Sequence, residues 1–122
     1  MINKEGIMSV NINELIRRID GEVLTKADQL EQIKISDGYV SDLLSDVMGN
    51  AKEHQVWITI MKHLNVIAVA ALANMSCVCF ANNVSPDQAV IDKANEEGIC
   101  LIKSPFSTFE IAGNLYQLLH KG

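Results

Sequence analysis

The residues that could do chemistry are most concentrated between residues 37 and 60, a stretch that contains the segment DGYVSDLLSDVM. It holds three aspartates, two serines and a histidine. Paired carboxylates of this kind can act as a general acid and a general base. On a helix, however, Asp42 and Asp46 fall on the face opposite Leu43 and Val47, where they would be solvated. We therefore interpret the stretch as a strand end, a cap and a covering helix rather than as a catalytic loop.

The cysteines and histidines form no nucleophilic or metal-binding pattern. Cys77, Cys79 and Cys100 lie in apolar, strand-like runs, away from any helix N-terminus that could lower the pKa of a thiol. The Cys-x-Cys spacing has no second pair to complete a zinc or iron–sulfur site, and neither GxGxxG nor GxxxxGK[ST] occurs. Among the histidines, only His63 is placed where it could take part in chemistry. We expect no catalytic residue, no metal and no cofactor.

The remaining candidates follow predicted strands. In a parallel sheet such turns share one edge, where helix N-termini supply amide donors and partial positive charge. Lys62 and Lys103 come soon after strands, with His63 beside the first, and this combination favours an anion such as a phosphate or a carboxylate. The expected ligand-binding residues are Asp37, Gly38, Ser41, Lys62, His63, Asn65, Asn82, Asn83, Lys103, Ser104, Ser107 and Thr108. Helix capping is the competing role for each serine and asparagine among them.

The elements that position this edge follow from hydrophobic periodicity and turn residues. Residues 12–19 are predicted to form an amphipathic helix and residues 22–25 a short strand. Strands are then expected at 33–40, with a kink at Gly38, and at 56–60, 77–81 and 99–102. The intervening helices are expected to begin at Ser41, Asn65, Ser85 and Ser107, the last two with capping boxes, and Gly98 to end the third. Strands alternating with helices predict a parallel sheet with right-handed crossovers and helices on its faces.

Composition limits the class of protein. The chain has 122 residues, 48% hydrophobic and 20% charged, which suits one globular domain. A formal net charge of −5 argues against a nucleic-acid partner. The weakly charged stretch 64–84 is better explained by a buried helix and strand than by a membrane span. With no signal peptide and an odd number of cysteines, we expect a cytoplasmic protein in which residues 1–8 form a flexible extension and residues 9–122 a single domain.

Four segments carry a family resemblance: GYVSDLLSDVM, VWITI, NVIAVAALA and KSPFSTFEIAGNLYQLL. Together they resemble a DRTGG-domain protein, from a family related to the N-terminal domain of HPr kinase/phosphorylase. The resemblance covers roughly residues 9–120 and implies a three-layer α/β/α sandwich with a four-stranded parallel sheet in the order 2-1-3-4. The DRTGG pentapeptide is absent, with Ser36–Asp37–Gly38 as its nearest remnant, and the P-loop domain is absent too. Kinase activity therefore does not carry over.

The resemblance also implies a setting. Stand-alone members are similar to proteins encoded beside anaerobic iron–iron hydrogenase and NADH-linked subunits, and larger proteins carry the domain as a regulatory or dimer-forming module beside CBS pairs or kinase domains. Our main hypothesis is a non-catalytic regulatory domain, a homodimer that senses a small anionic metabolite or nucleotide at the carboxyl edge of the sheet.

Three alternatives remain open. The first is a protein-interaction module of a hydrogenase-linked redox assembly or a kinase assembly, which would dock through its helical faces and residues such as Tyr116. The second is a small phosphotransfer or hydrolytic enzyme that uses His63. The third is an iron–sulfur protein, although three cysteines are fewer than the four thiolates that a cluster usually takes.

Overall fold

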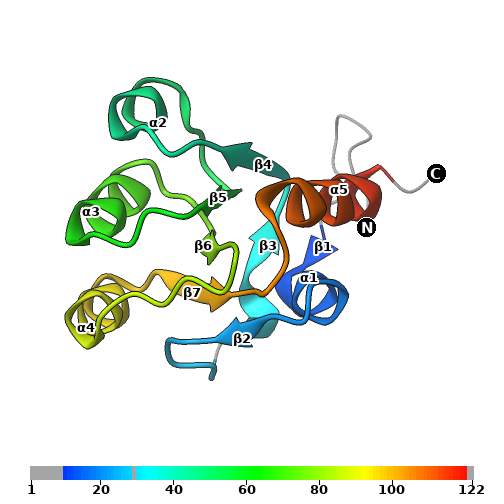
Figure 1. The fold of residues 1–122 in the computed structure, drawn as a ribbon, viewed down its shortest axis with the longest axis horizontal. Coiled ribbons are helices and arrows are strands. Elements are labelled where there is room, and N and C mark those ends of the chain that lie inside the picture. The colour runs from blue at the N-terminus through cyan, green and yellow to red at the C-terminus, as the bar shows by residue number, and fades with distance from the viewer. Residues whose placement is uncertain (1–9, 29, 121–122) are drawn as a thin grey trace.

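The computed structural model describes residues 10–28 and 30–120 and shows three layers, with helices on both faces of a central sheet (Figure 1). The expected extension at residues 1–8 lies outside the described residues. The elements, in chain order, are β1 (Val10–Asn11), α1 (Ile12–Arg18), β2 (Glu22–Val23), a 3₁₀ turn (Leu30–Gln32), β3 (Lys34–Ile35), β4 (Asp37–Val40), α2 (Leu44–Asn50), β5 (Gln55–Thr59), α3 (Leu64–Leu72), β6 (Cys77–Phe80), α4 (Gln88–Glu97), β7 (Cys100–Lys103) and α5 (Thr108–Leu119).

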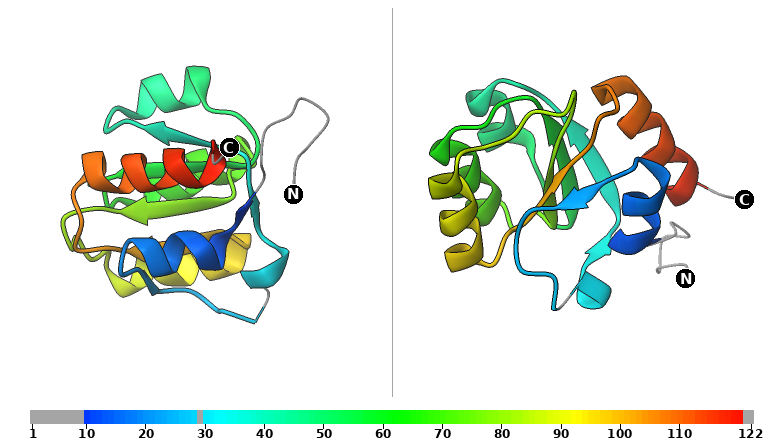
Figure 2. Two further views of the ribbon diagram at one scale, coloured as in Figure 1. Left: turned by 90° about the vertical axis from the view of Figure 1, so that its right-hand side faces the viewer. Right: turned by 60° about the horizontal axis from the view of Figure 1, so that its bottom comes forward.

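The central sheet has five strands in the order β2-β7-β6-β5-β4. The strands from β4 to β7 are parallel, as expected, whereas β2 adds to β7 in the antiparallel direction. The expected order 2-1-3-4 is wrong, because the four parallel strands follow one another across the sheet in chain order. Three successive right-handed crossovers in one direction place α2, α3 and α4 on the same face. The opposite face is covered by α1 and α5, which lie side by side (Figure 2).

The strand expected over residues 33–40 is two strands in different sheets. β3 pairs antiparallel with β1 in a separate two-stranded sheet, and β4 pairs with β5 in the main sheet. The chain changes partner at Ser36, whose amide donates to the His54 carbonyl (3.1 Å), and not at Gly38. Ile35 is fully buried against the α1 and α5 side of the core. Local periodicity could not show this break, because both halves are strand-like and only distant partners separate them.

The sheet separates two hydrophobic clusters. Side chains alternate along a strand, so Trp57 packs under α2, α3 and α4, whereas its neighbour Ile58 packs under α1 and α5. Every residue of β5 is buried, and β6 is buried along its whole length. Strands covered on both faces carry the continuous apolar runs that the sequence shows at these positions. The α/β sandwich therefore rests on the alternation of strands and helices that the sequence predicts.

Two helix boundaries were predicted correctly. Ser107 caps α5, where its Oγ accepts from the Glu110 amide (3.1 Å) and the Glu110 carboxylate accepts from the Ser107 amide (2.9 Å), which completes the capping box. Gly98 ends α4 in the left-handed conformation, with φ of 73°. Both signals depend on residues within one turn of each other, which is why sequence alone identified them.

Three other helix starts were predicted at the wrong residue. The residue in the capping position is Leu43 for α2, His63 for α3 and Asp87 for α4, instead of Ser41, Asn65 and Ser85. Within the described chain, none of these three helices has a side chain that caps its first turn. Each expected cap is polar, but the geometry of the preceding strand end decides where helical dihedrals begin.

Candidate functional site

The turns that follow β4, β5, β6 and β7 lie on one edge of the sheet, which we call the carboxyl rim. The parallel register aligns Val40 with Ile58, Ile58 with Cys79 and Cys79 with Ile102, so the four strands end together. The structure brings to this rim all the expected ligand-binding residues except two: Ser41, Lys62, His63, Asn65, Asn82, Asn83, Lys103, Ser104, Ser107 and Thr108. The predicted edge therefore exists.

Asp37 and Gly38 lie elsewhere. They open β4, and Asp37 is aligned with Gln55, the first residue of β5. The Asp37 carboxylate accepts from Gln55 Nε2 (2.9 Å) at the amino edge of the sheet. A Cβ added to Gly38 would lie 2.7 Å from Leu115 Cδ2, so this glycine permits close packing of α5 on β4. Their expected place at the rim is wrong, because DGYV forms the strand itself and not the turn after it.

The rim serines hold the loops together. Ser104 is fully buried, and its hydroxyl donates to the Ile19 carbonyl (2.6 Å) and accepts from the Phe106 amide (3.1 Å). Ser107 belongs to the capping box of α5. The Ser41 hydroxyl accepts from the Leu43 amide (3.2 Å) in the turn before α2. These hydroxyls shape the rim through internal hydrogen bonds, and Ser107 is the one among them that caps a helix.

Sequence reasoning missed Asp42. Its carboxylate does not face solvent from a helix; it precedes α2 and accepts from the Thr59 hydroxyl (2.6 Å) and from the Ile60 amide (2.9 Å). Thr59 is fully buried. The aspartate thus ties the turn after β4 to the end of β5. The signal that could have found it is its position directly between a strand end and a helix start, where aspartate favours turns.

The start of α3 is the part of the rim best suited to an anion. Lys62 and His63 directly precede this nine-residue helix, both are exposed, and its first turn has no side-chain cap within the described residues. Uncapped amides and the positive end of the helix dipole attract negative charge. The start of α4 differs, because its capping residue is Asp87, whose carboxylate would oppose an anion.

Two asparagines form a tight turn directly after β6. Asn82 and Asn83 have φ of 54° and 59°, a left-handed conformation that asparagine tolerates better than most residues. The Asn82 amide donates to Phe106 O (2.8 Å) and the Asn83 amide to Ser104 O (2.8 Å). The backbone of the turn is therefore fixed to the loop before α5, and both side chains are exposed at the rim.

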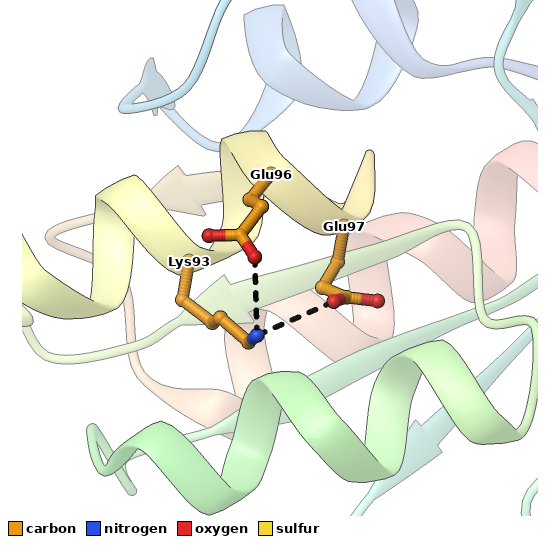
Figure 3. Close-up of polar contacts among 3 residues, drawn as sticks. All are labelled: Lys93, Glu96 and Glu97. Carbon is orange, nitrogen blue, oxygen red and sulfur yellow. Dashed lines mark hydrogen bonds and ion pairs between the residues drawn. The ribbon is translucent and has the colours of Figure 1, made fainter.

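Lys103 completes the positive charge at the rim. It ends β7 between Phe80 of β6 and Glu22 of β2, and it is half-buried. Lys93 on α4, by contrast, is engaged by two carboxylates of its own helix (Figure 3): its Nζ lies 3.4 Å from Glu96 Oε1 and 3.4 Å from Glu97 Oε2. Hydrogen bonds and attraction from these carboxylates raise the pKa of Lys93.

No cysteine thiol lies at the rim among the described residues. The cysteines are buried within β6 and β7. Burial raises the pKa of Cys79 to about 12 and raises that of Cys77 well above its usual value. Hydrogen bonds from Cys77 and Thr25 lower the pKa of Cys100, which corrects the expectation that nothing near the thiols would do so. The described chain also contains no group of three His, Cys, Asp or Glu side chains placed to hold a metal ion.

Two hollows lie at the opposite, amino edge of the sheet, where sequence reasoning placed nothing. One cavity of about 470 Å³ is lined by residues that include Thr25 and Cys100, and a second of about 510 Å³ by residues that include His54 and Asn74. The two share a wall of Gln32, Ile33, Gly98 and Ile99. Each is large enough for a small molecule.

The fold is an α/β/α sandwich, and the comparisons give its family. The family model of the DRTGG domain matches residues 14–118, so the chain belongs to the DRTGG domain family. No curated protein matches the chain in sequence. No helix in the described ranges is long and apolar enough to cross a membrane.

One similar solved structure shows the same fold. It is the crystal structure of the CBS and DRTGG domains of the regulatory region of Clostridium perfringens pyrophosphatase, complexed with the activator diadenosine tetraphosphate. The TM-score is 0.74 at 14% sequence identity, and the match covers 89% of this chain and 47% of that chain. The present chain thus spans about half the length of that structure. In that structure the DRTGG domain belongs to the regulatory region of an enzyme, and neither finding assigns a catalytic role to the present chain.

Proposed function

We propose that this chain is a ligand-sensing domain that binds a small anion, either a phosphate-bearing metabolite or a nucleotide, at the carboxyl rim. The observation that carries the proposal is the start of α3, where Lys62 and His63 precede an uncapped first turn. Free amide donors, the helix dipole and a flexible ammonium group are the usual partners of a phosphate in proteins. The regulatory region similar to this chain was complexed with a nucleotide activator, which supports the same class of ligand.

Titration calorimetry and thermal unfolding test this proposal. The ligand panel contains inorganic phosphate, acetyl phosphate, AMP, ATP and diadenosine tetraphosphate, at constant ionic strength because exposed charges are screened by salt. We expect at least one of these compounds to raise the Tm in a concentration-dependent way. The Lys62→Ala variant should bind that compound at least about tenfold more weakly, since a hydrogen bond to a charged group contributes about 1.5–3 kcal/mol.

Lys34→Ala is the matched control, because Lys34 is an exposed lysine of β3 at the amino edge of the sheet and its loss changes the net charge equally. Equal weakening by Lys34→Ala and Lys62→Ala would mean that net charge, and not the rim, governs binding. Binding unchanged in a double Lys62→Ala and Lys103→Ala variant, or no binding of any compound in the panel, would refute the anion site.

The second candidate function is docking of a protein partner, with a second copy of the chain as the expected partner. Four apolar side chains are exposed where β4 and β5 end and where α2 and α3 begin: Val40 is 52% exposed, Leu43 61%, Ile60 44% and Leu64 51%. β4 is also the terminal strand of the sheet, so one of its edges is free of a strand partner in the described part of the chain. Apolar patches and open strand edges are common features of association sites.

Sedimentation analysis of the purified protein tests the homodimer. We expect a dimer that Leu43→Glu converts to a monomer, because a buried unpaired carboxylate is unfavourable in an apolar interface. Leu72→Glu is the control, since Leu72 is 77% exposed but ends α3 at the opposite edge. A monomeric wild-type protein would exclude the homodimer and leave a different partner, such as the redox or kinase assembly that the family resemblance predicts, to be sought by co-purification.

A further inference from the structure

Two of the three cysteines face each other across neighbouring strands. The register of β6 and β7 aligns Cys77 directly with Cys100, whereas Cys79 is aligned with Ile102. All three cysteines belong to the hydrophobic cluster under α1 and α5, so their side chains leave the sheet on the same face. The sequence separates the aligned pair by more than twenty positions and therefore gave no indication of it.

The spacing of the strands determines which pair of thiols can be joined. Neighbouring strands lie about 4.8 Å apart, which falls within the range of about 4.4–6.8 Å between the Cα atoms of natural disulfides. Cys77 and Cys79 are two positions apart on one strand, roughly 6.6 Å, at the upper end of that range and with parallel side chains. Cys79 has no thiol opposite it. Cys77 and Cys100 are thus the pair compatible with a bridge.

Cys100 is also the thiol best placed to meet a reagent. It lines the cavity of about 470 Å³ at the amino edge, together with Thr25, Lys26 and Ile33. Cys100 is 6% exposed, whereas Cys77 and Cys79 are fully buried. A reagent of a few heavy atoms fits a cavity of this volume.

The surroundings of Cys77 and Cys100 determine which of the two thiols reacts first. The Cys77 thiol and the Thr25 hydroxyl beside the Cys100 sulfur lower the pKa of Cys100. Burial and the same contact with Cys100 raise the pKa of Cys77. Because the thiolate is the attacking form, Cys100 should react first, and Cys77 should keep its proton until the second step.

We propose that Cys100 is a modification site that reacts with small uncharged disulfides entering the amino-edge cavity, and that Cys77 is its resolving thiol. In the first step the Cys100 thiolate attacks one sulfur of R–S–S–R, forming Cys100–S–S–R. The released thiolate takes up the proton that Cys100 has lost, giving RSH. In the second step Cys77 loses its proton, attacks the Cys100 sulfur and expels the second RSH. Two protein thiols are oxidised to one disulfide, and one R–S–S–R is reduced to two RSH.

This site is independent of the anion site at the carboxyl rim, because it lies at the opposite edge of the sheet. A bridge between Cys77 and Cys100 would join β6 to β7 at their first residues. An adduct on Cys100 would occupy the cavity. Either product changes the amino edge while the residues at the start of α3 stay in place, so failure of one proposal does not affect the other.

The test uses the pre-reduced wild-type protein and 2-hydroxyethyl disulfide, under conditions in which circular dichroism shows it folded. After an acid quench and alkylation of the remaining thiols, peptide mass spectrometry identifies each cysteine's state. We expect a mixed disulfide on Cys100 that converts to a Cys77–Cys100 disulfide, with Cys79 still reduced. A brief pulse of iodoacetamide on the reduced protein should modify Cys100 at least about tenfold faster than Cys79.

Variants separate the two steps. Cys79→Ala should still form the bridge, whereas Cys77→Ala should stop at the mixed disulfide on Cys100. Equal modification rates at all three cysteines would show that the thiols react only through unfolding, and would overturn the proposal. A wild-type protein that forms no Cys77–Cys100 disulfide, or one that bridges through Cys79, would overturn it as well. The wild-type measurements decide the question even if a variant does not fold.

Discussion

Replacing Gly38 by alanine tests why the sheet can accept α5 so closely. The added Cβ would lie 2.7 Å from Leu115 Cδ2, well inside the 3.4 Å at which ordinary contact begins. Leu115 is only 2% exposed, so its side chain is held by the core on most sides. A cavity of about 150 Å³, lined by both residues, gives it some room to move. The substitution should therefore strain the contact between β4 and α5 without abolishing the fold.

The expected size follows from two opposing effects. Overpacking of this kind typically costs about 1–3 kcal/mol. Alanine also restricts the unfolded chain more than glycine does, which offsets this cost by about 0.5–1 kcal/mol. We expect a net loss of about 1–2 kcal/mol in the free energy of unfolding. At a typical dependence of about 1–3 kcal/mol per molar urea, the unfolding midpoint should fall by roughly 0.3–2 M with an unchanged slope.

Urea denaturation followed by Trp57 fluorescence measures this change, because Trp57 is the only tryptophan and is fully buried. Gly113→Ala is the matched control: Gly113 lies inside α5, and a Cβ there meets nothing within 4 Å. Its replacement should stabilise the protein by up to about 1 kcal/mol, since alanine favours helix over glycine.

A double-mutant cycle identifies the contact responsible. Leu115→Val shortens the side chain that meets the new Cβ, so the cost of Gly38→Ala should fall by at least about 0.5 kcal/mol when both changes are present. Strictly additive costs would refute the assignment of the strain to Leu115. A Gly38→Ala variant as stable as the wild type would refute the packing role of Gly38 altogether.

Three further predictions concern hydrogen bonds seen only in the structure or confirmed by it. Asp42→Ala removes the carboxylate that accepts from the buried Thr59 hydroxyl, and urea denaturation should show that the free energy of unfolding falls by about 1–3 kcal/mol. Asp42→Asn keeps an acceptor oxygen and should be destabilised less. Equal destabilisation by the two substitutions would contradict this role of Asp42. Ser107→Ala removes the cap of α5 and should cost about 1 kcal/mol, whereas no change would mean that the capping box is dispensable. Hydrogen bonds from Ser41, Tyr39 and Asn50 lower the pKa of Asp46 in the folded protein below its usual value of 3.8. These bonds therefore stabilise the folded protein above pH 3.8, and this contribution is lost as the pH falls below that value and Asp46 takes up a proton. Tyr39→Phe should therefore be less stable than the wild type near neutral pH, with a difference that shrinks on acidification, and a difference constant with pH would exclude this role.

Local signals in the sequence were enough for much of the fold. The alternation of apolar strands with helical patterns identified the four parallel strands and the helices between them. The capping box of Ser107 and Glu110 and the left-handed Gly98 were predicted because each signal lies within a single helical turn. The carboxyl rim followed from the same alternation, since parallel strands joined by helices must bring their ends to one edge.

The capping errors mark where local reasoning stops. Ser41, Asn65 and Ser85 all have side chains suited to an N-cap, yet the capping residue of each helix lies two positions from the predicted one. The strand ends are set by pairing with neighbouring strands, and that pairing determines where each helix can start. Asp42 belongs to the same case, because its hydrogen bonds to Thr59 and Ile60 exist only once β4 and β5 lie side by side.

The sequence by itself therefore determined most of the helices and parallel strands and the edge at which strand-to-helix turns gather. Only the tertiary structure decided the strand order, the antiparallel addition of β2, the division of residues 33–40 between two sheets, and the pairing of Cys77 with Cys100. The physical reason is the range of the interactions involved. Helix caps and periodicity depend on neighbours within a few residues, whereas strand order depends on how distant segments together bury both faces of the sheet.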